Sequence, residues 1–224
     1  MIPVAEVTIT TVSENTSTGR GLLGEWGLCM LVQAGSRKLL LDTGASAQVT
    51  RNLDTLKVDL TGLEALVLSH GHYDHTGGLA AVLARAGGAE VPVIAHPAIW
   101  GPKYSKNAKT GRYSFTGLPH RIEELERLGA RFRLSKAPTW FGEDIAASGE
   151  EPMTTDFEAV MPSAFLKTEG GYVPDPLADD QSLYIRTDQG LVILLGCAHR
   201  GVVNIVRHAR ELMGTERVHM IVGG

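Results

Sequence analysis

The chain contains the stretch Ala65-Leu66-Val67-Leu68-Ser69-His70-Gly71-His72-Tyr73-Asp74-His75-Thr76-Gly77-Gly78, and this stretch decides the fold. Its first residues are apolar and predict a short strand that is buried on both faces. The polar turn that follows places three imidazoles and one carboxylate within six residues. Neutral imidazole nitrogens and carboxylate oxygens suit a borderline divalent ion such as zinc, and also manganese or iron. The stretch therefore predicts a metal site at the end of a strand.

A histidine-rich surface loop, or histidines bonded to backbone carbonyls, would be the alternatives to a metal site. Three of the chain's eight histidines lie within these six residues, so chance explains the clustering poorly. The glycines at positions 71, 77 and 78 also permit close backbone approach and unusual dihedral angles. We therefore expect the turn to bind metal.

Outside this turn, short apolar segments alternate with glycine-rich turns, which is typical of an α/β protein. We expect strands at 4–12, 28–32, 37–41, 65–68, 91–95, 130–134, 182–186, 191–195 and 218–222, and helices at 47–56, 78–86, 121–128 and 202–212. Residues 101–118 show no sustained period and are expected to form a long loop. No linker or repeat divides the sequence, so residues 1–224 are expected to form one domain.

The composition excludes several classes of protein. The chain has 224 residues, of which 43% are hydrophobic and 21% charged, too apolar for a disordered chain. Its net charge of −4 argues against a general nucleic-acid binder. No apolar run reaches the roughly 20 residues of a membrane span, and the first residues lack the pattern of a secretory signal. We therefore expect a cytoplasmic protein with reduced cysteines and no membrane contact, and the sequence leaves an oligomer open.

The motif His70-x-His72-x-Asp74-His75, with Asp42-Thr43-Gly44 at the end of an earlier strand, resembles the metallo-β-lactamase superfamily of metallohydrolases. More specifically, it resembles the branch of the archaeal dihydropterin ribofuranosylaminobenzene 5′-phosphate synthase. Further stretches match that branch: Asp179-Asp180-Gln181-Ser182-Leu183, Gly196-Cys197-Ala198-His199 and Gly223-Gly224. The resemblance implies an αββα sandwich with two divalent metal ions at one edge of two packed sheets. Branch members continue past the glycine pair with a further histidine, so we expect the domain to lack its C-terminal closing segment.

The resemblance also implies roles for the residues of the turn. His70 and His72 are expected to bind one ion, and Asp74 and His75 the other. Asp74 and His75 are also the expected catalytic residues, because Asp74 would help to orient the attacking water. Zinc is the expected metal, and manganese, iron and magnesium are the alternatives.

Later loops are expected to complete the site. The stretch from 196 to 199 stands where many superfamily members have a Gly-Asp pair whose carboxylate bridges the ions. We expect His199 to be an additional metal ligand. Alternatively, His199 contacts one of the ligand residues and not the metal itself. Cys197 is expected to be a packed residue, with a thiolate ligand as its alternative. Asp42 and Asp180 are expected either to bind metal or to orient a ligand, and each could instead be a simple turn residue.

The segment 101–121 is basic and aromatic. It carries five Lys and Arg residues and no acid. We expect it to form a lid that attracts a small anionic substrate, with Lys103, Lys106 and Arg112 as binding residues. An ordinary solvated loop is the alternative. His96, at the end of a predicted strand, is expected to be either a further substrate contact or a structural histidine.

Three functions are consistent with these patterns. The first is a metal-dependent hydrolase that acts on a small anionic, phosphorylated substrate through a metal-activated water. The second is a transferase like the dihydropterin aminobenzene ribotide synthase, which would release pyrophosphate. The third is a metal-binding sensor module without catalysis.

Overall fold

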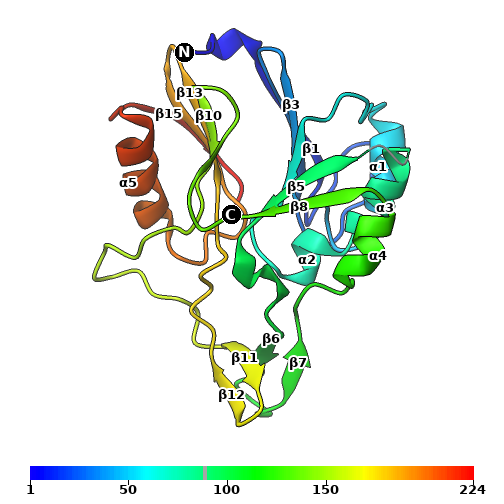
Figure 1. The fold of residues 1–224 in the computed structure, drawn as a ribbon, viewed down its shortest axis with the longest axis vertical. Helices are drawn as coiled ribbons and strands as arrows, with labels where there is room; N and C mark the ends of the chain where they lie inside the picture. The colour runs from blue at the N-terminus through cyan, green and yellow to red at the C-terminus, as the bar shows by residue number, and fades with distance from the viewer. Residues whose placement is uncertain (88–89) are drawn as a thin grey trace.

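The computed structural model describes residues 1–87 and 90–224. Two larger sheets lie side by side, with helices on their outer faces (Figure 1). One helix, α5 (Val202–Met213), covers one outer face. The opposite outer face is covered by α1 (Val49–Thr55), α3 (Leu79–Arg85) and α4 (Ile122–Arg127). This arrangement confirms the predicted αββα sandwich.

The first sheet has six strands. Their order is β1 (Val7–Ser13), β2 (Cys29–Ala34), β3 (Arg37–Leu41), β4 (Ala65–Val67), β5 (Val91–Ala95) and β8 (Ala130–Leu134). The pairs from β3 to β8 are parallel, so their carboxyl ends meet at one edge of the sheet. The residues that follow β3, β4 and β5 therefore lie close together, although they are far apart in the sequence.

The second sheet faces the first. Its order is β15 (Val218–Val222), β14 (Gly190–Leu194), β13 (Leu183–Thr187), β10 (Ile145–Ala147) and β9 (Thr139–Trp140). A third, smaller sheet projects from one end of the molecule (Figure 1). This small sheet consists of β12 (Gly171–Pro174), β11 (Ala164–Thr168), β6 (Lys103–Lys106) and β7 (Tyr113–Phe115). The structure also contains short helical turns at Val4–Glu6 (η1), Tyr73–Thr76 (α2) and Pro97–Trp100 (η2).

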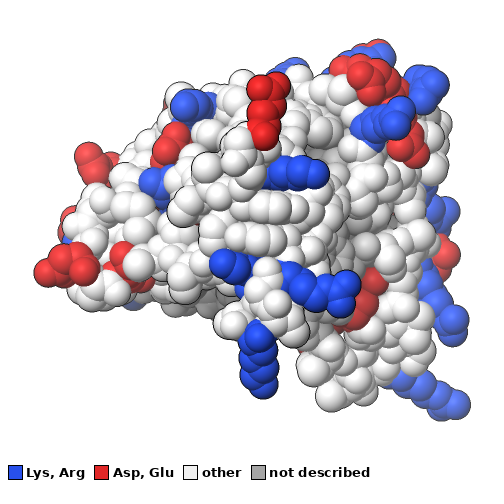
Figure 2. Space-filling model, turned by 90° about the horizontal axis from the view of Figure 1, so that it is seen from below, with Lys and Arg blue, Asp and Glu red and all other residues white. Residues whose placement is uncertain are grey.

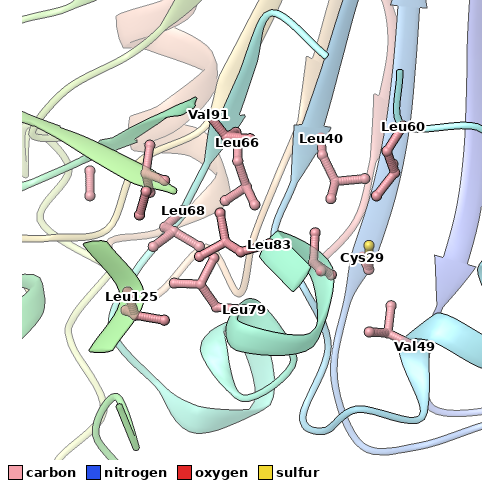
Figure 3. Close-up of a cluster of buried hydrophobic side chains, with 14 of the residues drawn as sticks. Cys29, Leu40, Val49, Leu60, Leu66, Leu68, Leu79, Leu83, Val91 and Leu125 are labelled. Atoms are coloured by element: carbon pink, nitrogen blue, oxygen red, sulfur yellow. The ribbon is translucent and has the colours of Figure 1, made fainter. Parts of the chain in front are cut away.

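Alternating side chains of the inner strands build the core. In β3, Leu39 and Leu41 pack between the two large sheets, whereas Leu40 packs toward α1 and α3 (Figure 3). All three side chains are fully buried because both faces of the sheet are covered. Tyr184 and Ile193 of the second sheet pack against Ile205 of α5. This core makes the strand ends at the sheet edge a rigid support.

The prediction of one long loop at 101–118 is wrong, because this segment contains β6 and β7. β6 pairs with β7 and with β11, which lies about sixty residues later in the chain, whereas β7 pairs with β6 at the edge of the small sheet. The place of this hairpin in a sheet therefore depends on a distant strand that no local periodicity reveals. The other predicted strands and helices are confirmed to within a few residues, except that the first strand begins with the turn η1. None of the described helices has the length and apolar character that a membrane span requires.

Candidate metal centre

The ends of β3 and β4 hold the polar turn through Asp42. Leu41 pairs with Val67 across these parallel strands, which places Asp42 beside Ser69. One carboxylate oxygen, Oδ1, accepts a hydrogen bond from the Ser69 backbone at 2.7 Å. The other, Oδ2, accepts from Ser69 Oγ at 2.7 Å and from His75 Nδ1 at 2.6 Å. Asp42 therefore fixes the His75 ring with its Nε2 atom free to face the site.

Three imidazoles form the first donor group. The distance from His70 Nε2 to His72 Nδ1 is 2.9 Å, and His199 Nε2 lies 3.2 Å from each of these atoms. A tetrahedral zinc ion with Zn–N bonds of about 2.0 Å holds its nitrogen ligands about 3.3 Å apart. The structure brings together His70, His72 and His199, and this donor set and its spacing fit a zinc-like ion.

Burial keeps these imidazoles neutral, which is the form that binds metal. Burial, together with the neighbouring imidazoles, lowers the pKa of His70 well below its usual value. The same causes, with the charge of Lys103, lower the pKa of His72 to about 2 and that of His199 to about 4. No proton has to leave these nitrogens before a cation binds near neutral pH.

A second donor group contains His70, His75 and Cys197, whose donor atoms all lie within 4.8 Å of one another. His75 Nε2 lies 3.1 Å from Cys197 Sγ and 3.5 Å from Asp74 Oδ2. Burial opposes a charge on His75, but the Asp42 carboxylate holds its pKa well above the usual value. Burial raises the pKa of Asp74. The two groups share His70, so they are adjacent parts of one centre.

The loop after β14 brings Cys197 and His199 to the turn. A side chain at Gly196 would place its Cβ 2.2 Å from Ser69 Oγ, so glycine is required for this close approach. Ala198, between the two donors, has a φ of 51°. The loop is held by Asp180, whose Oδ2 accepts a hydrogen bond from the Arg200 backbone at 2.8 Å. Asp180 therefore supports a ligand loop and does not itself point at the imidazoles, and burial raises its pKa to about 8.

The neighbouring acid, Asp179, supports the other ligand segment. Its Oδ2 accepts from the backbone of Gly71, between two of the histidines, at 2.8 Å. Its Oδ1 accepts from Lys103 Nζ at 2.8 Å, and Lys103 also donates to Asp175 at 3.0 Å. Lys103 is 1% exposed, and the two carboxylates raise its pKa although burial opposes its charge. It therefore does not stand free to meet a substrate, contrary to the expected lid.

The other expected substrate residues do not line the large cavity beside the imidazoles that is described below. Lys106 is exposed, with Nζ 5.5 Å from the centre of the Tyr113 ring, and Arg112 is exposed beyond it. His96 is buried behind the site, where Nδ1 accepts from Ala98 and Nε2 lies 3.5 Å from a Glu150 oxygen. Figure 2 views the molecule from the end of the small sheet: Lys and Arg side chains project separately, with wide uncharged areas between them.

A cavity of about 830 Å³ opens beside the donor groups. Residues of the centre form one wall: His72, Asp74, His75, Cys197 and His199. Apolar and aromatic side chains form much of the rest, including Trp26, Leu28, Met30, Tyr73, Tyr104 and Met161. No Lys or Arg occurs among the described residues that line it. A second cavity, of about 400 Å³, lies near α1 and α3 and contains none of the donors.

Sequence analysis gave no role to Ser69, and it did not foresee that Asp179 supports the backbone of Gly71 or that aromatic side chains from several segments line one cavity. Ser69 is part of the decisive stretch, and its position directly before the first histidine was the available signal. Asp179 could be seen as one of two adjacent acids before a strand, but its bond to Gly71 spans 108 residues. The aromatic wall comes from separate segments and has no local signal.

Comparisons with known proteins agree with this geometry. The family model "Metallo-beta-lactamase superfamily" matches residues 27–203. A 7,8-dihydropterin-6-methyl-4-(beta-D-ribofuranosyl)-aminobenzene-5'-phosphate synthase of Methanocaldococcus jannaschii is 30% identical, over 88% of this chain and 69% of the relative. A crystal structure of a metal-dependent hydrolase of the beta-lactamase superfamily superposes with a TM-score of 0.78 at 28% identity, over 97% of this chain and 76% of that chain. An N-acyl homoserine lactone hydrolase shares the fold with a TM-score of 0.51 at 14% identity, over 100% of this chain and 93% of that one. The chain therefore belongs to the metallo-β-lactamase superfamily, as its motifs predicted.

Proposed function

We propose that the chain is a metal-dependent hydrolase that binds two divalent ions, most favourably zinc, and acts on a small anionic substrate. One observation carries this proposal. The nitrogen donors of His70, His72 and His199 converge to 2.9–3.2 Å from two segments more than 120 residues apart, at the wall of a large cavity. A convergence of neutral donors without another buried partner is typical of a metal site.

Asp74, beside His75 of the second donor group, is placed to act as the base. When bound, the ions supply Lewis-acid polarisation and lower the pKa of a water toward about 7. Asp74 lines the cavity and its pKa is raised by burial, so its Oδ2 can take up a proton from an attacking water. Asp42 holds His75 through Nδ1 and so fixes the ring beside Asp74. His72 and His199 form the adjoining wall against which the reacting group would lie.

The cavity lining also bears on the substrate. Because no Lys or Arg is found among its described lining residues, a negative charge on the substrate would be met by the ions and not by a basic lid. Trp26, Tyr104 and Met161 offer apolar surface for the remainder of the molecule. We infer a compact substrate with its anionic group next to the reacting bond and an apolar or planar group further out.

The test combines metal content with turnover. Protein reconstituted with zinc or manganese should retain ions in elemental analysis and hydrolyse some member of a panel of nitrophenyl esters, phosphomonoesters and phosphodiesters. His72→Ala should lose ions and turnover while its circular dichroism stays unchanged. His219→Ala, at an exposed position of β15, is the matched control and should retain both. Wild-type protein that stays free of ions would refute the proposal, whereas ions without turnover would favour a sensor module.

A transferase of the pterin-synthase type is the second candidate. Its support is the 30% identity to the Methanocaldococcus jannaschii synthase over most of this chain, together with the aromatic wall of the cavity. Such a reaction would use the same ions to hold a pyrophosphate leaving group while an amine displaces it. Pyrophosphate released in proportion to an added aminobenzene ribotide would support the transferase. Release that does not depend on this acceptor would support the hydrolase.

A further inference from the structure

The connection between β10 and β11 is long and irregular. Residues 148–163, which we call the β10–β11 loop and all of which the structure describes, contain neither helix nor strand. Connections of this length are uncommon inside a compact domain, and they are usually binding loops or disordered segments. This loop runs from the second sheet past the start of α5 to the small sheet (Figure 1), and its Met161 lines the large cavity. A fixed position of the loop would therefore define one wall of that cavity.

A buried amide of α5 holds the β10–β11 loop. Asn204 is fully buried, and its Oδ1 accepts hydrogen bonds from the backbone of Thr154 and of Thr155, both at 2.8 Å. Its Nδ2 donates to the carbonyl oxygen of Arg200 at 2.8 Å. Arg200 directly follows His199, which lines the cavity from another side. One side chain thus ties the β10–β11 loop to the segment that carries His199.

A carboxylate of the loop makes a second attachment. The helix α5 begins after Gly201, which has no side chain to cap the first N–H groups. Glu158 takes this role, because its Oε1 accepts from the Val203 backbone at 2.9 Å and its Oε2 from the Asn204 backbone at 2.8 Å. A Cβ at Gly201 would lie 2.3 Å from Glu158 Cδ, so glycine leaves room for the carboxylate. Phe157, between the two attachments, is 68% exposed, so apolar packing contributes little to holding this part of the loop.

We propose that Asn204 is a positioning residue that sets the substrate preference of the cavity, because it holds Met161 at a fixed distance from the wall that carries His199. This inference rests on the proposed hydrolase function and names the residue that governs the apolar part of its substrate. Met161 is 39% exposed, and its flexible thioether adapts to groups of different shape. A substrate with an aryl group on this side gains contact with Met161, whereas a compact substrate does not.

Chymotrypsin digestion tests whether Asn204 holds the loop. The protease cleaves after aromatic residues, but it needs a detached, extended segment around Phe157. Asn204→Ala should accelerate cleavage after Phe157, identified by fragment mass, by at least about tenfold, because two buried backbone bonds are lost. Asn107→Ala is the matched control, since Asn107 also accepts from two backbone N–H groups, but at the exposed turn between β6 and β7. This control should leave the rate unchanged.

The affinities of zinc-loaded protein for two phosphonates test the preference. Phenylphosphonate and methylphosphonate share the anionic group and differ only in the apolar one, and calorimetry gives their Kd values. Wild-type protein should bind phenylphosphonate at least about fivefold more tightly, and Met161→Ala should reduce this ratio. Asn204→Ala should reduce it by a similar factor, and the double variant should reduce it no further, because Asn204 acts through Met161. Asn107→Ala should keep the wild-type ratio.

A second variant answers the test if Asn204→Ala does not give the circular dichroism of the folded protein. Glu158 is half-buried, and Glu158→Gln leaves an amide that accepts only one of the two helix N–H bonds. Cleavage after Phe157 and the phosphonate ratio should both change in the same direction as for Asn204→Ala, by a smaller factor.

The outcomes separate this inference from the proposed function. A wild-type phosphonate ratio in folded Asn204→Ala would overturn the inference, and so would an equal weakening of both phosphonates, which would show a structural role only. Turnover of the substrate panel by wild-type protein without a preference for the phenyl group would refute the inference and leave the hydrolase proposal intact. A preference for phenylphosphonate without turnover would refute the hydrolase alone. Wild-type protein that binds neither phosphonate would overturn both.

Discussion

The turn at 69–76 and the segment at 101–118 are both rich in functional side chains, yet they relate differently to the structure. The turn is anchored directly to two core strands by Asp42, and its chemistry comes largely from its own residues. The segment forms two strands of the small sheet, and its Lys103 is neutralised by acids 72 and 76 residues away. The function of a dense local motif can therefore be predicted from its own residues. The role of scattered charged residues depends on partners elsewhere in the chain.

The largest effect is expected in the turn at 69–76, which Asp42 anchors. Asp42→Ala leaves the Ser69 backbone, the Ser69 hydroxyl and His75 Nδ1 without their buried acceptor. We expect the free energy of unfolding to fall by about 4 kcal/mol. Zinc content should fall with it, because His75 would no longer be oriented. Urea unfolding and elemental analysis measure the two effects, and unchanged values would show that the turn holds itself without Asp42. The exposed Asp59→Ala is the control.

A somewhat smaller effect is expected in the small sheet. Lys103→Met leaves Asp175 and Asp179 buried without their cation. We expect the free energy of unfolding to fall by about 3 kcal/mol, less than for Asp42→Ala because the carboxylates can take up protons. Lys106→Met, at the exposed last position of the same strand, should change the free energy of unfolding by under about 0.5 kcal/mol. A raised KM with unchanged stability for Lys103→Met would restore the lid interpretation.

Metal removal sharpens the comparison, because only the turn should respond to it. Zinc at about 100 times its Kd should stabilise the folded chain by about 2.7 kcal/mol relative to chelator-treated protein. Thermal unfolding with and without chelator measures the shift. His72→Ala should abolish the shift, whereas Lys106→Met should leave it unchanged. A shift that survives in His72→Ala would place the ion elsewhere.

A further prediction concerns the pH dependence of stability. Burial raises the pKa of Asp180 from 3.8 to about 8, so across this range the folded state keeps a proton that the unfolded state releases. Its contribution to stability is complete below pH 3.8 and is lost as the pH rises through about 8. Metal-free Asp180→Asn, which keeps an acceptor for the Arg200 backbone, should gain stability relative to wild type as the pH rises between these values, as measured by denaturant unfolding. The difference between the two proteins cancels the opposite pH dependence of His70, His72 and His199, which both share. The exposed Asp156→Asn should follow the wild type, and a difference that stays constant over this range would contradict the prediction.

Much of the fold could be predicted because the inner strands carry their signal locally. Leu39, Leu40 and Leu41 are consecutive apolar residues, a pattern that indicates burial on both faces. The strands β9 to β12 were missed because they are short, with two to five residues. Of these, β10 and β11 pair with the distant strands β13 and β6, while β9 and β12 pair with β10 and β11, and no local period shows the distant pairs.

The candidate site divides in the same way. His70, His72 and His75 could be assigned from one turn, and His199 from a motif carried by the resemblance. Asp180 was identified as a residue of interest, but its bond to the loop of Arg200 could not be foreseen. Lys103 was placed in a lid because its acid partners are remote in the sequence. Roles that depend on neighbouring residues in the sequence could be predicted. Roles that depend on contacts between distant segments could not.

Gly71 is a position that directed evolution of this protein should leave unchanged. A Cβ at this position would meet the Ile99 carbonyl oxygen at 2.4 Å and Lys103 Cε at 3.1 Å. Any larger residue would push its flanking histidines out of register, so a mutational library should spare it. Tyr73, two positions later, is 40% exposed and borders the cavity, which makes it a suitable place to randomise for new substrates.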